Sequence, residues 1–174
     1  IACVMIYRAL FVAGVRTPYR ELVRERGYLQ TLLETIPDLV WLKDPNGVYL
    51  SCNKTFERFV GAPAAEIIGK TDYDFVPREL ADSFRRNDRI AIEKGGLTIN
   101  EEALVFGTND YRGIFETTKT PMHDNQGRII GVLGISHDIT ARKALELELR
   151  DKDAQFRLAI ESSPDGFWVT NLEG

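Results

Sequence analysis

The feature that most constrains the fold is a motif that occurs twice, once near each end of the chain. It reads LLETIPDLVWLKDPNG in the first copy and LAIESSPDGFWVTNLEG in the second. Five residues recur at a constant offset of about 127 positions: Glu34, Pro37, Asp38, Trp41 and Gly47 match Glu161, Pro164, Asp165, Trp168 and Gly174. An offset of this size is typical of tandem copies of a whole domain, because solenoid repeats are much shorter. We therefore expect one complete domain and the beginning of a second, from a longer multidomain polypeptide.

Composition is that of an ordinary globular chain, with 44% hydrophobic and 28% charged residues among 174. The net charge of -4 argues against nucleic acid as a partner, because binding of phosphate needs a basic face. Cys3 and Cys52 form no CxxC motif, so neither a disulfide framework nor a zinc site is indicated. This cysteine usage favours a reducing compartment, the cytoplasm.

The first 14 residues are apolar except for Arg8, and further arginines follow them. A membrane-spanning helix needs about 20 apolar residues, so this segment is too short to cross a bilayer alone. Two interpretations stay open. The segment is either the inner end of a transmembrane helix with arginines on the cytoplasmic side, or a connector helix that follows a preceding domain. Residues 1–27 are assigned to this N-terminal connector helix or tail of a transmembrane segment.

Hydrophobic periodicity and turn residues predict an α+β fold. A helix over residues 18–35 ends before Pro37, and Asn53 caps a short helix that ends at Gly61. The strands are expected at residues 39–42, 48–50, 97–106, 111–121 and 128–135, with short helices and a long helix over residues 78–94 between the second and the third. This order predicts a five-stranded antiparallel sheet with helices on one face.

After the last strand, Asp138, Ile139 and Thr140 precede a run of strong helix formers without Gly or Pro. Asp138 or Thr140 is expected to cap this exit helix. Its heptad pattern is partial, because Lys152 interrupts the seam of Leu145, Leu149 and Phe156, so a short coiled coil stays an open alternative.

Four stretches, in this order and spacing, resemble PAS sensory domains: PDLVWLKDPNGVYLSCNKTF, GKTDYDFVP, ETTKTPMHDNQGRIIGVLGI and the DIT triplet at residues 138–140. The resemblance assigns residues 28–140 to a PAS domain and residues 141–155 to a signalling helix. Residues 156–174 resemble the start of a second, truncated PAS domain.

Resemblance to PAS domains implies a sheet curved around a small pocket. The pocket detects a ligand, cofactor or redox state, and the exit helix relays the signal to an output domain of histidine kinase (two-component) or diguanylate cyclase type. It also implies a homodimer through the flanking helices, in the cytoplasm or on the cytoplasmic side of a membrane anchor. The alternative is a ligand-free scaffold for dimerisation or protein–protein interaction.

Two groups of residues are candidates for these roles. The signal relay is assigned to Asp138, Ile139 and Thr140, with a purely structural helix cap as the alternative. Aromatic residues that either line the pocket or form plain core are Trp41, Phe56, Phe59, Tyr73, Phe75, Phe84, Phe106 and Phe115.

No residue selects a cofactor. His123 falls in a turn and His137 at the end of a strand, so neither resembles the axial histidine of haem-binding relatives, and both are expected on the surface. Cys52 lacks the asparagine-cysteine-arginine motif of flavin-binding LOV relatives, so it is expected to be a small buried hydrophobe. A flavin of the FAD type stays open because aromatic residues such as Trp41 are present, and the cofactor is unknown.

No catalytic or metal site is predicted. Within the core of the domain, close carboxylate pairs occur only at Asp72 and Asp74 and at Glu101 and Glu102. Adjacent strand residues point to opposite faces, so Glu101 and Glu102 do not share a pocket. All four carboxylates are expected to be solvated or to cap helices, and the chain is not expected to be an enzyme.

Overall fold

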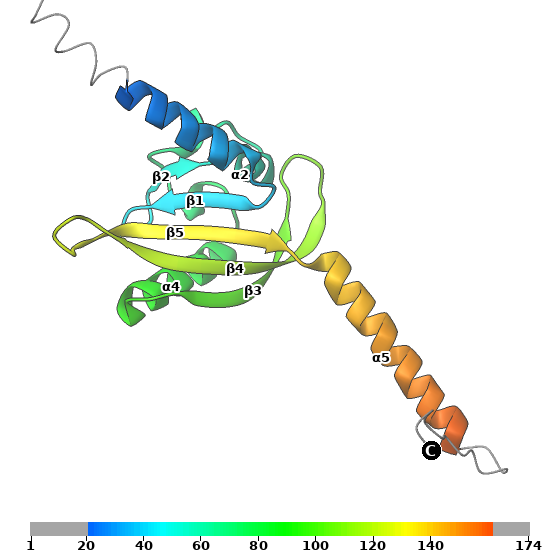
Figure 1. Ribbon diagram of the computed structural model, residues 1–174. Helices are drawn as coiled ribbons and strands as arrows, with labels where there is room; N and C mark the ends of the chain where they lie inside the picture. The colour runs from blue at the N-terminus through cyan, green and yellow to red at the C-terminus, as the bar shows by residue number, and fades with distance from the viewer. Residues whose placement is uncertain (1–20, 162–174) are drawn as a thin grey trace, which may run out of the picture.

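The computed structural model describes residues 21–161, and Figure 1 shows the arrangement of their elements. An N-terminal helix over residues 21–35 precedes the domain. The elements that follow are β1 (Leu39–Lys43), β2 (Tyr49–Cys52), α2 (Lys54–Val60), α3 (Ala64–Ile67), the 3₁₀ turn η1 (Asp72–Asp74), α4 (Arg78–Lys94), β3 (Thr98–Val105), β4 (Arg112–His123), β5 (Ile129–Asp138) and α5 (Thr140–Glu161).

The strands form one antiparallel sheet in the order β2-β1-β5-β4-β3. The last strand, β5, therefore lies at the centre of the sheet, between β1 and β4. Buried and exposed side chains alternate along β4, where Phe115, Thr117 and Lys119 face inward. Helix α4 lies across the inner face, as Figure 1 shows, so the predicted α+β layout is confirmed.

Local sequence explains several of these boundaries. Asn53 caps α2 by accepting a hydrogen bond from the backbone N–H of Phe56, and the same side chain donates to the backbone oxygen of Asp38. Helix α4 begins after Pro77 and ends at Gly95, whose φ of 65° is left-handed, so its predicted range is confirmed. Gly47 is needed at the β1–β2 turn because its φ of 90° is a backbone conformation that residues with a side chain rarely adopt.

The exit helix α5 continues to Glu161, where the run of strong helix formers ends, and its last turns include residues 156–161, which were assigned to the start of a second PAS domain. Residues 1–14 and the second motif copy from residue 162 onward lie outside the described residues. Within residues 21–161, no helix is long and apolar enough to cross a membrane.

Candidate functional site

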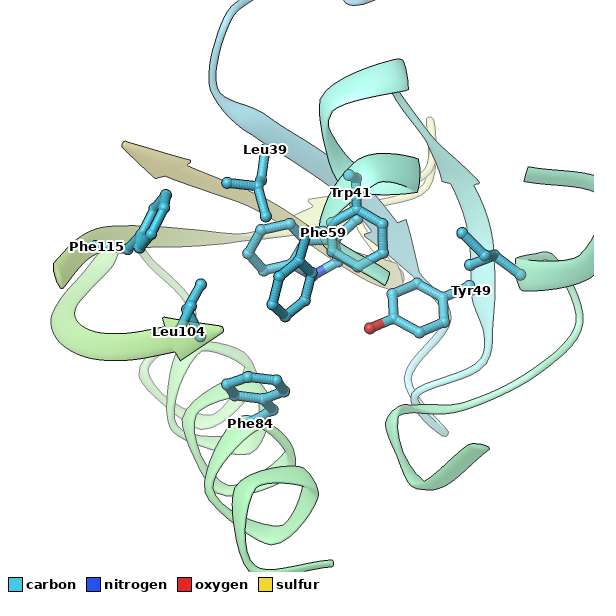
Figure 2. Close-up of a cluster of buried hydrophobic side chains, with 9 residues drawn as sticks. Leu39, Trp41, Tyr49, Phe59, Phe84, Leu104 and Phe115 are labelled. Carbon is cyan, nitrogen blue, oxygen red and sulfur yellow. The ribbon is translucent and has the colours of Figure 1, made fainter. Parts of the chain in front are cut away.

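A small cavity lies between the sheet and the helices on its inner face. Figure 2 shows the buried side chains that converge there, with the Tyr49 hydroxyl pointing into the cluster. The lining residues are Leu39, Trp41, Lys43, Tyr49, Phe56, Phe59, Asp72, Phe84, Glu102 and Leu104. The free volume is about 10 Å³, close to the space that one water molecule needs. The walls are mostly apolar, with a small polar part.

Trp41 is the central aromatic wall of this cavity. Its ring lies over Gly134 on the neighbouring strand, because Trp41 and Gly134 are opposite each other in the β1–β5 register and a Cβ at Gly134 would lie 2.3 Å from the indole. The indole is only 7% exposed, and its Nε1 atom has no hydrogen-bond partner within the described chain. The cavity therefore contains one unpaired N–H donor.

The predicted aromatic residues divide into three groups. Trp41, Phe56, Phe59 and Phe84 line the cavity. Phe75, Phe106 and Phe115 belong to the surrounding core or pack against it, and Phe106 contacts the rings of both Phe59 and Phe115.

Tyr73 is the exception, and its expected place in the pocket is wrong. Its side chain is 50% exposed, and its hydroxyl donates a hydrogen bond to Asp82 at 2.7 Å. The reason is the 3₁₀ turn η1, which directs Asp72 inward and the next residue outward.

Asp72 is the start of a buried polar network that sequence reasoning missed. Nζ of Lys43 lies 2.6 Å from Oδ2 of Asp72, and the hydroxyl of Tyr49 donates to Oδ1 of Asp72 at 2.6 Å. Both charged side chains are 1% exposed, so the expectation of a solvated Asp72 is wrong. Asp74 is solvated as expected and forms a capping box with Thr71.

A second buried carboxylate, Asp88 on α4, joins two strands to the helix. Its Oδ1 lies 2.6 Å from Nζ of Lys119 on β4, and its Oδ2 lies 3.2 Å from Nζ of Lys43 on β1. Lys119 also donates to the backbone oxygen of Phe84, and Arg85 contacts Asp88 at 3.2 Å. The only sequence signal for these lysines is the alternation of the strands, which places Lys43 two positions after Trp41 and Lys119 two positions after Thr117.

The electrostatics of this network follow from burial and pairing. Burial alone opposes ionisation of Asp88, but Lys43 and Lys119 outweigh it and lower the pKa of Asp88 below its ordinary value. Burial, followed by the charge of Asp72, raises the pKa of Tyr49 well above its ordinary value. Asp88 is therefore ionised and Tyr49 neutral at physiological pH, an arrangement of fixed charges rather than a proton-transfer pair.

The exit junction joins the end of β5 to the start of α5. Oδ1 of Asp138 accepts hydrogen bonds from the backbone N–H and the hydroxyl of Thr140, at 2.9 and 2.6 Å. Thr140 Oγ1 accepts from the backbone N–H of Ile114, and Tyr111 donates to Oδ2 of Asp138 at 2.6 Å. Ile139 is 2% exposed and donates its backbone N–H to Ile114. Tyr111 is the member of this cluster that sequence reasoning missed.

Ion pairs hold the first turn of α5 against the sheet. Lys143 contacts Glu101 at 2.7 Å, and Arg142 contacts Glu116 at 3.4 Å. Glu101 thus faces outward, whereas its neighbour Glu102 lines the cavity, as strand alternation requires.

Of the residues weighed for cofactors, Trp41 lines the cavity, whereas His123, His137 and Cys52 do not. His123 is exposed at the end of β4, and His137 is exposed and lies 2.7 Å from Asp38. Cys52 is partly buried on β2, and burial, followed by the charge of Glu57, raises the pKa of its thiol to about 11. Within residues 21–161 there is no cluster of three metal-binding side chains.

Known proteins that resemble this chain include signalling enzymes. The chain is 29% identical over 124 residues to the methanogenesis regulatory histidine kinase FilI of Methanothrix harundinacea, covering 71% of this chain and 14% of the relative. It is 28% identical over 112 residues to a diguanylate cyclase of Vibrio cholerae, covering 64% of this chain and 35% of the relative. The chain thus spans a minor part of these relatives and is homologous to sensor domains of signalling proteins.

A solved neighbour corrects the expectation about nucleic acid. The VqmA–ligand–DNA complex of Vibrio cholerae has a TM-score of 0.59 and 27% identity, covering 63% of this chain and 50% of that chain. A protein similar to this chain therefore binds DNA, and excluding nucleic acid on the basis of a net charge of -4 was wrong. The physical reason is that a net charge sums over a whole domain, whereas contacts with phosphate depend on the local surface and on any further parts of the protein.

The family model described as the PAS fold matches residues 33–144, which include the cavity and the first turns of the exit helix. Because that match covers more than half of the sequence and agrees with the observed sheet, the chain belongs to the PAS family.

Proposed function

We propose that this chain is the sensory module of a longer signalling protein, in which a ligand, cofactor or redox change at the cavity alters the start of α5. The observation that carries the proposal is a continuous series of contacts from the cavity to the exit junction. The ring of Phe59, which lines the cavity, lies 5.6 Å from that of Phe106, and Phe106 lies 5.6 Å from Tyr111. Tyr111 then donates its hydrogen bond to Asp138.

The mechanism is a shift between two populations of the exit junction. Asp138 caps the first turn of α5, and a cap of this kind contributes about 1 kcal/mol, enough to bias a balanced equilibrium at the helix start. Displacement of Phe59 by an occupant moves Phe106 and Tyr111, which changes the hydrogen bond that orients Asp138. Asp138, Ile139 and Thr140 are the relay residues in this proposal, and Tyr111 connects them to the cavity.

The output lies beyond α5. The similarity to a histidine kinase and a diguanylate cyclase supports an output domain of either type, and the small share of each relative that the chain covers supports a multidomain protein. The second motif copy supports a tandem PAS arrangement. The chain itself acts without catalysis in this proposal, and the cytoplasmic location stays a prediction.

The relay is tested in a fusion whose α5 continues into the catalytic part of a histidine kinase. Asp138→Ala and Thr140→Val are expected to change autophosphorylation several-fold, because both remove hydrogen bonds at the helix start. Asp151→Ala, on the exposed surface of the same helix and away from the junction, is the matched control and should match the wild-type chain. Unchanged autophosphorylation in both junction variants would contradict the relay.

A second candidate function is a ligand-free scaffold for protein–protein interaction. The observation that favours it is the closely packed interior, whose cavity holds about one water and whose charges pair with one another. In this case the junction variants still change the activity of the fusion, but no added small molecule does.

A further inference from the structure

The cavity presents one hydrogen-bond donor without an acceptor. Nε1 of Trp41 is the buried side-chain nitrogen without a partner in the described part of the chain, and the indole nitrogen lies inside the cluster drawn in Figure 2. Leaving such a group unpaired is unfavourable, so buried donors normally bond to protein, water or a ligand. An occupant of this cavity is therefore expected to offer an acceptor to Trp41.

The charges around the cavity cancel. Every cation of the buried network has a carboxylate partner within 3.2 Å. The charged groups that line the cavity or lie directly behind it are three cations and three carboxylates, namely Lys43, Arg85, Lys119, Asp72, Asp88 and Glu102. A charged occupant would add an uncompensated charge to a poorly hydrated interior, which is strongly unfavourable.

The walls and one further polar group restrict the occupant's shape. The rings of Phe56, Phe59 and Phe84 form much of the lining, and aromatic faces pack well against flat surfaces. Glu102 also lines the cavity, and its Oε1 accepts hydrogen bonds from Asn87 and Asn100. A carboxylate has about four acceptor positions, so Glu102 has capacity for a donor from an occupant.

We propose that the cavity binds a small, flat, uncharged molecule that accepts a hydrogen bond from Trp41 Nε1 and donates one to Glu102. One-ring amides and lactams have this chemistry. The proposal rests on the sensory function above and specifies the class of molecule that the site detects. Because the cavity has free space for about one water, binding requires the surrounding side chains to move outward. That outward movement would displace Phe59 toward Phe106.

The test follows the Trp41 indole N–H resonance by two-dimensional NMR of the isotopically labelled chain, with Trp41→Phe to assign the peak. Three matched probes are nicotinamide, which is neutral, nicotinate, which is an anion, and the 1-methylnicotinamide cation. 2-Pyridone is a second neutral probe. At millimolar concentration we expect the neutral probes to move the resonance downfield. We expect the affinity of both ions to be lower than that of the neutral probes by a factor of roughly 10 or more. No shift with either neutral probe, with only water in contact with the indole, would overturn the proposal, as would tighter binding of nicotinate.

The role of charge balance in the cavity is tested with a separate variant. Glu102→Gln removes one carboxylate but keeps a side chain of the same shape on the edge strand β3, so binding of nicotinate relative to nicotinamide should rise. Glu101→Gln changes the neighbouring residue, which faces away from the cavity, and should leave that ratio unchanged. An unchanged ratio in Glu102→Gln would contradict the role of charge balance. Since these binding measurements involve no output domain, their failure is distinguishable from failure of the relay in the kinase fusion.

Discussion

Nζ of Lys119 lies 2.6 Å from Oδ1 of Asp88 in the interior between β4 and α4, where Asp88 is fully buried. The same carboxylate is 3.2 Å from Lys43, so one aspartate compensates two buried lysines. Asp88→Ala leaves Lys119 without its carboxylate, and of its hydrogen bonds it keeps the one to the backbone oxygen of Phe84. Removing one partner from a buried ion pair costs about 3–5 kcal/mol, and we expect a loss of this size in the free energy of unfolding, measured by urea denaturation.

The matched control is Asp82→Ala, which removes a carboxylate from the same helix. Asp82 is partly exposed and accepts a hydrogen bond from the exposed Tyr73, so a loss of about 1 kcal/mol or less is expected. Replacing both buried partners, as in Asp88→Leu with Lys119→Met, should recover part of the lost stability, because no charge then stays unpaired. Equal losses for Asp88→Ala and Asp82→Ala would contradict a stabilising role of the network.

Stability should fall in acid partly because of Asp88. The pKa of Asp88 is lowered in the folded state, so the unfolded chain binds a proton more readily. The resulting stability is fully present above the ordinary aspartate pKa of about 3.9 and is lost as the pH falls through the lower, folded-state pKa. We expect the free energy of unfolding of Asp88→Asn to depend less steeply on pH than that of the wild-type chain below about pH 4.5. Urea denaturation at a series of pH values between neutral and acidic measures this dependence.

Other carboxylates with a lowered pKa also contribute to the loss of stability in acid. Burial raises the pKa of Asp138, but its hydrogen bonds with Thr140 and Tyr111 outweigh burial and lower that pKa. In Asp88→Asn, the slope of the free energy of unfolding against pH should therefore decrease without vanishing. Ser83→Ala, also on α4, retains every carboxylate and is expected to keep the wild-type slope. A wild-type slope in Asp88→Asn would show that the aspartate does not titrate as inferred.

Tyr111 and Asp138 should be energetically coupled. The hydroxyl of Tyr111 donates to Asp138 at 2.6 Å, and Tyr111→Phe removes this hydrogen bond while the ring next to Phe106 is kept. In a double-mutant cycle with Asp138→Ala, we expect a coupling of about 0.5–1.5 kcal/mol in the free energy of unfolding. Tyr28→Phe, on the N-terminal helix, is the control and should be additive with Asp138→Ala, since its hydroxyl bonds to Arg24 instead. Additivity for Tyr111→Phe would exclude the hydrogen bond as the connection to the cap.

Much of the fold could be predicted because local signals coincide with its boundaries. Pro77 and Gly95 mark both ends of α4, and Asn53 marks the start of α2. The ends of β4 and β5 were predicted too early. Pairing between Phe115 and Asp138 and between His123 and Ile129 extends both strands, and this depends on the partner strand rather than on local sequence.

The polar part of the site could not be predicted in the same way. Lysine and aspartate are almost always exposed unless paired, so Lys43, Asp72, Asp88 and Lys119 are expected on the surface when each is considered alone. Their pairing joins residues 29 to 45 positions apart and becomes evident only when the helices lie over the sheet. The aromatic residues, by contrast, could be expected in the interior, as pocket lining or as plain core, because burial of a phenylalanine needs no specific partner; Trp41, Phe56, Phe59 and Phe84 line the cavity.

The thiol of Cys52 should be unreactive in the folded chain. Burial, and then the charge of the nearby Glu57, raises its pKa to about 11, so the reactive thiolate is scarce near neutral pH. At pH 8 a shift of this size lowers the thiolate fraction roughly 100-fold relative to an ordinary cysteine. We expect iodoacetamide to modify Cys52 in the folded chain slower than in the urea-unfolded chain by about that factor, as followed by mass spectrometry of the peptide that contains it.

A variant at Glu57 separates burial from charge as the cause of the raised pKa of Cys52. Glu57→Gln removes the negative charge but keeps oxygen that can accept the hydrogen bond from the backbone N–H of Ala64, so the fold should persist. Because burial is the larger cause of the raised pKa, this variant should increase the alkylation rate only severalfold, well short of the rate in the unfolded chain. Glu66→Gln, an exposed change on α3, is the control and should leave the rate unchanged. Rapid alkylation of Cys52 in the folded wild-type chain would mean that β2 opens to solvent far more readily than its pairing with β1 implies.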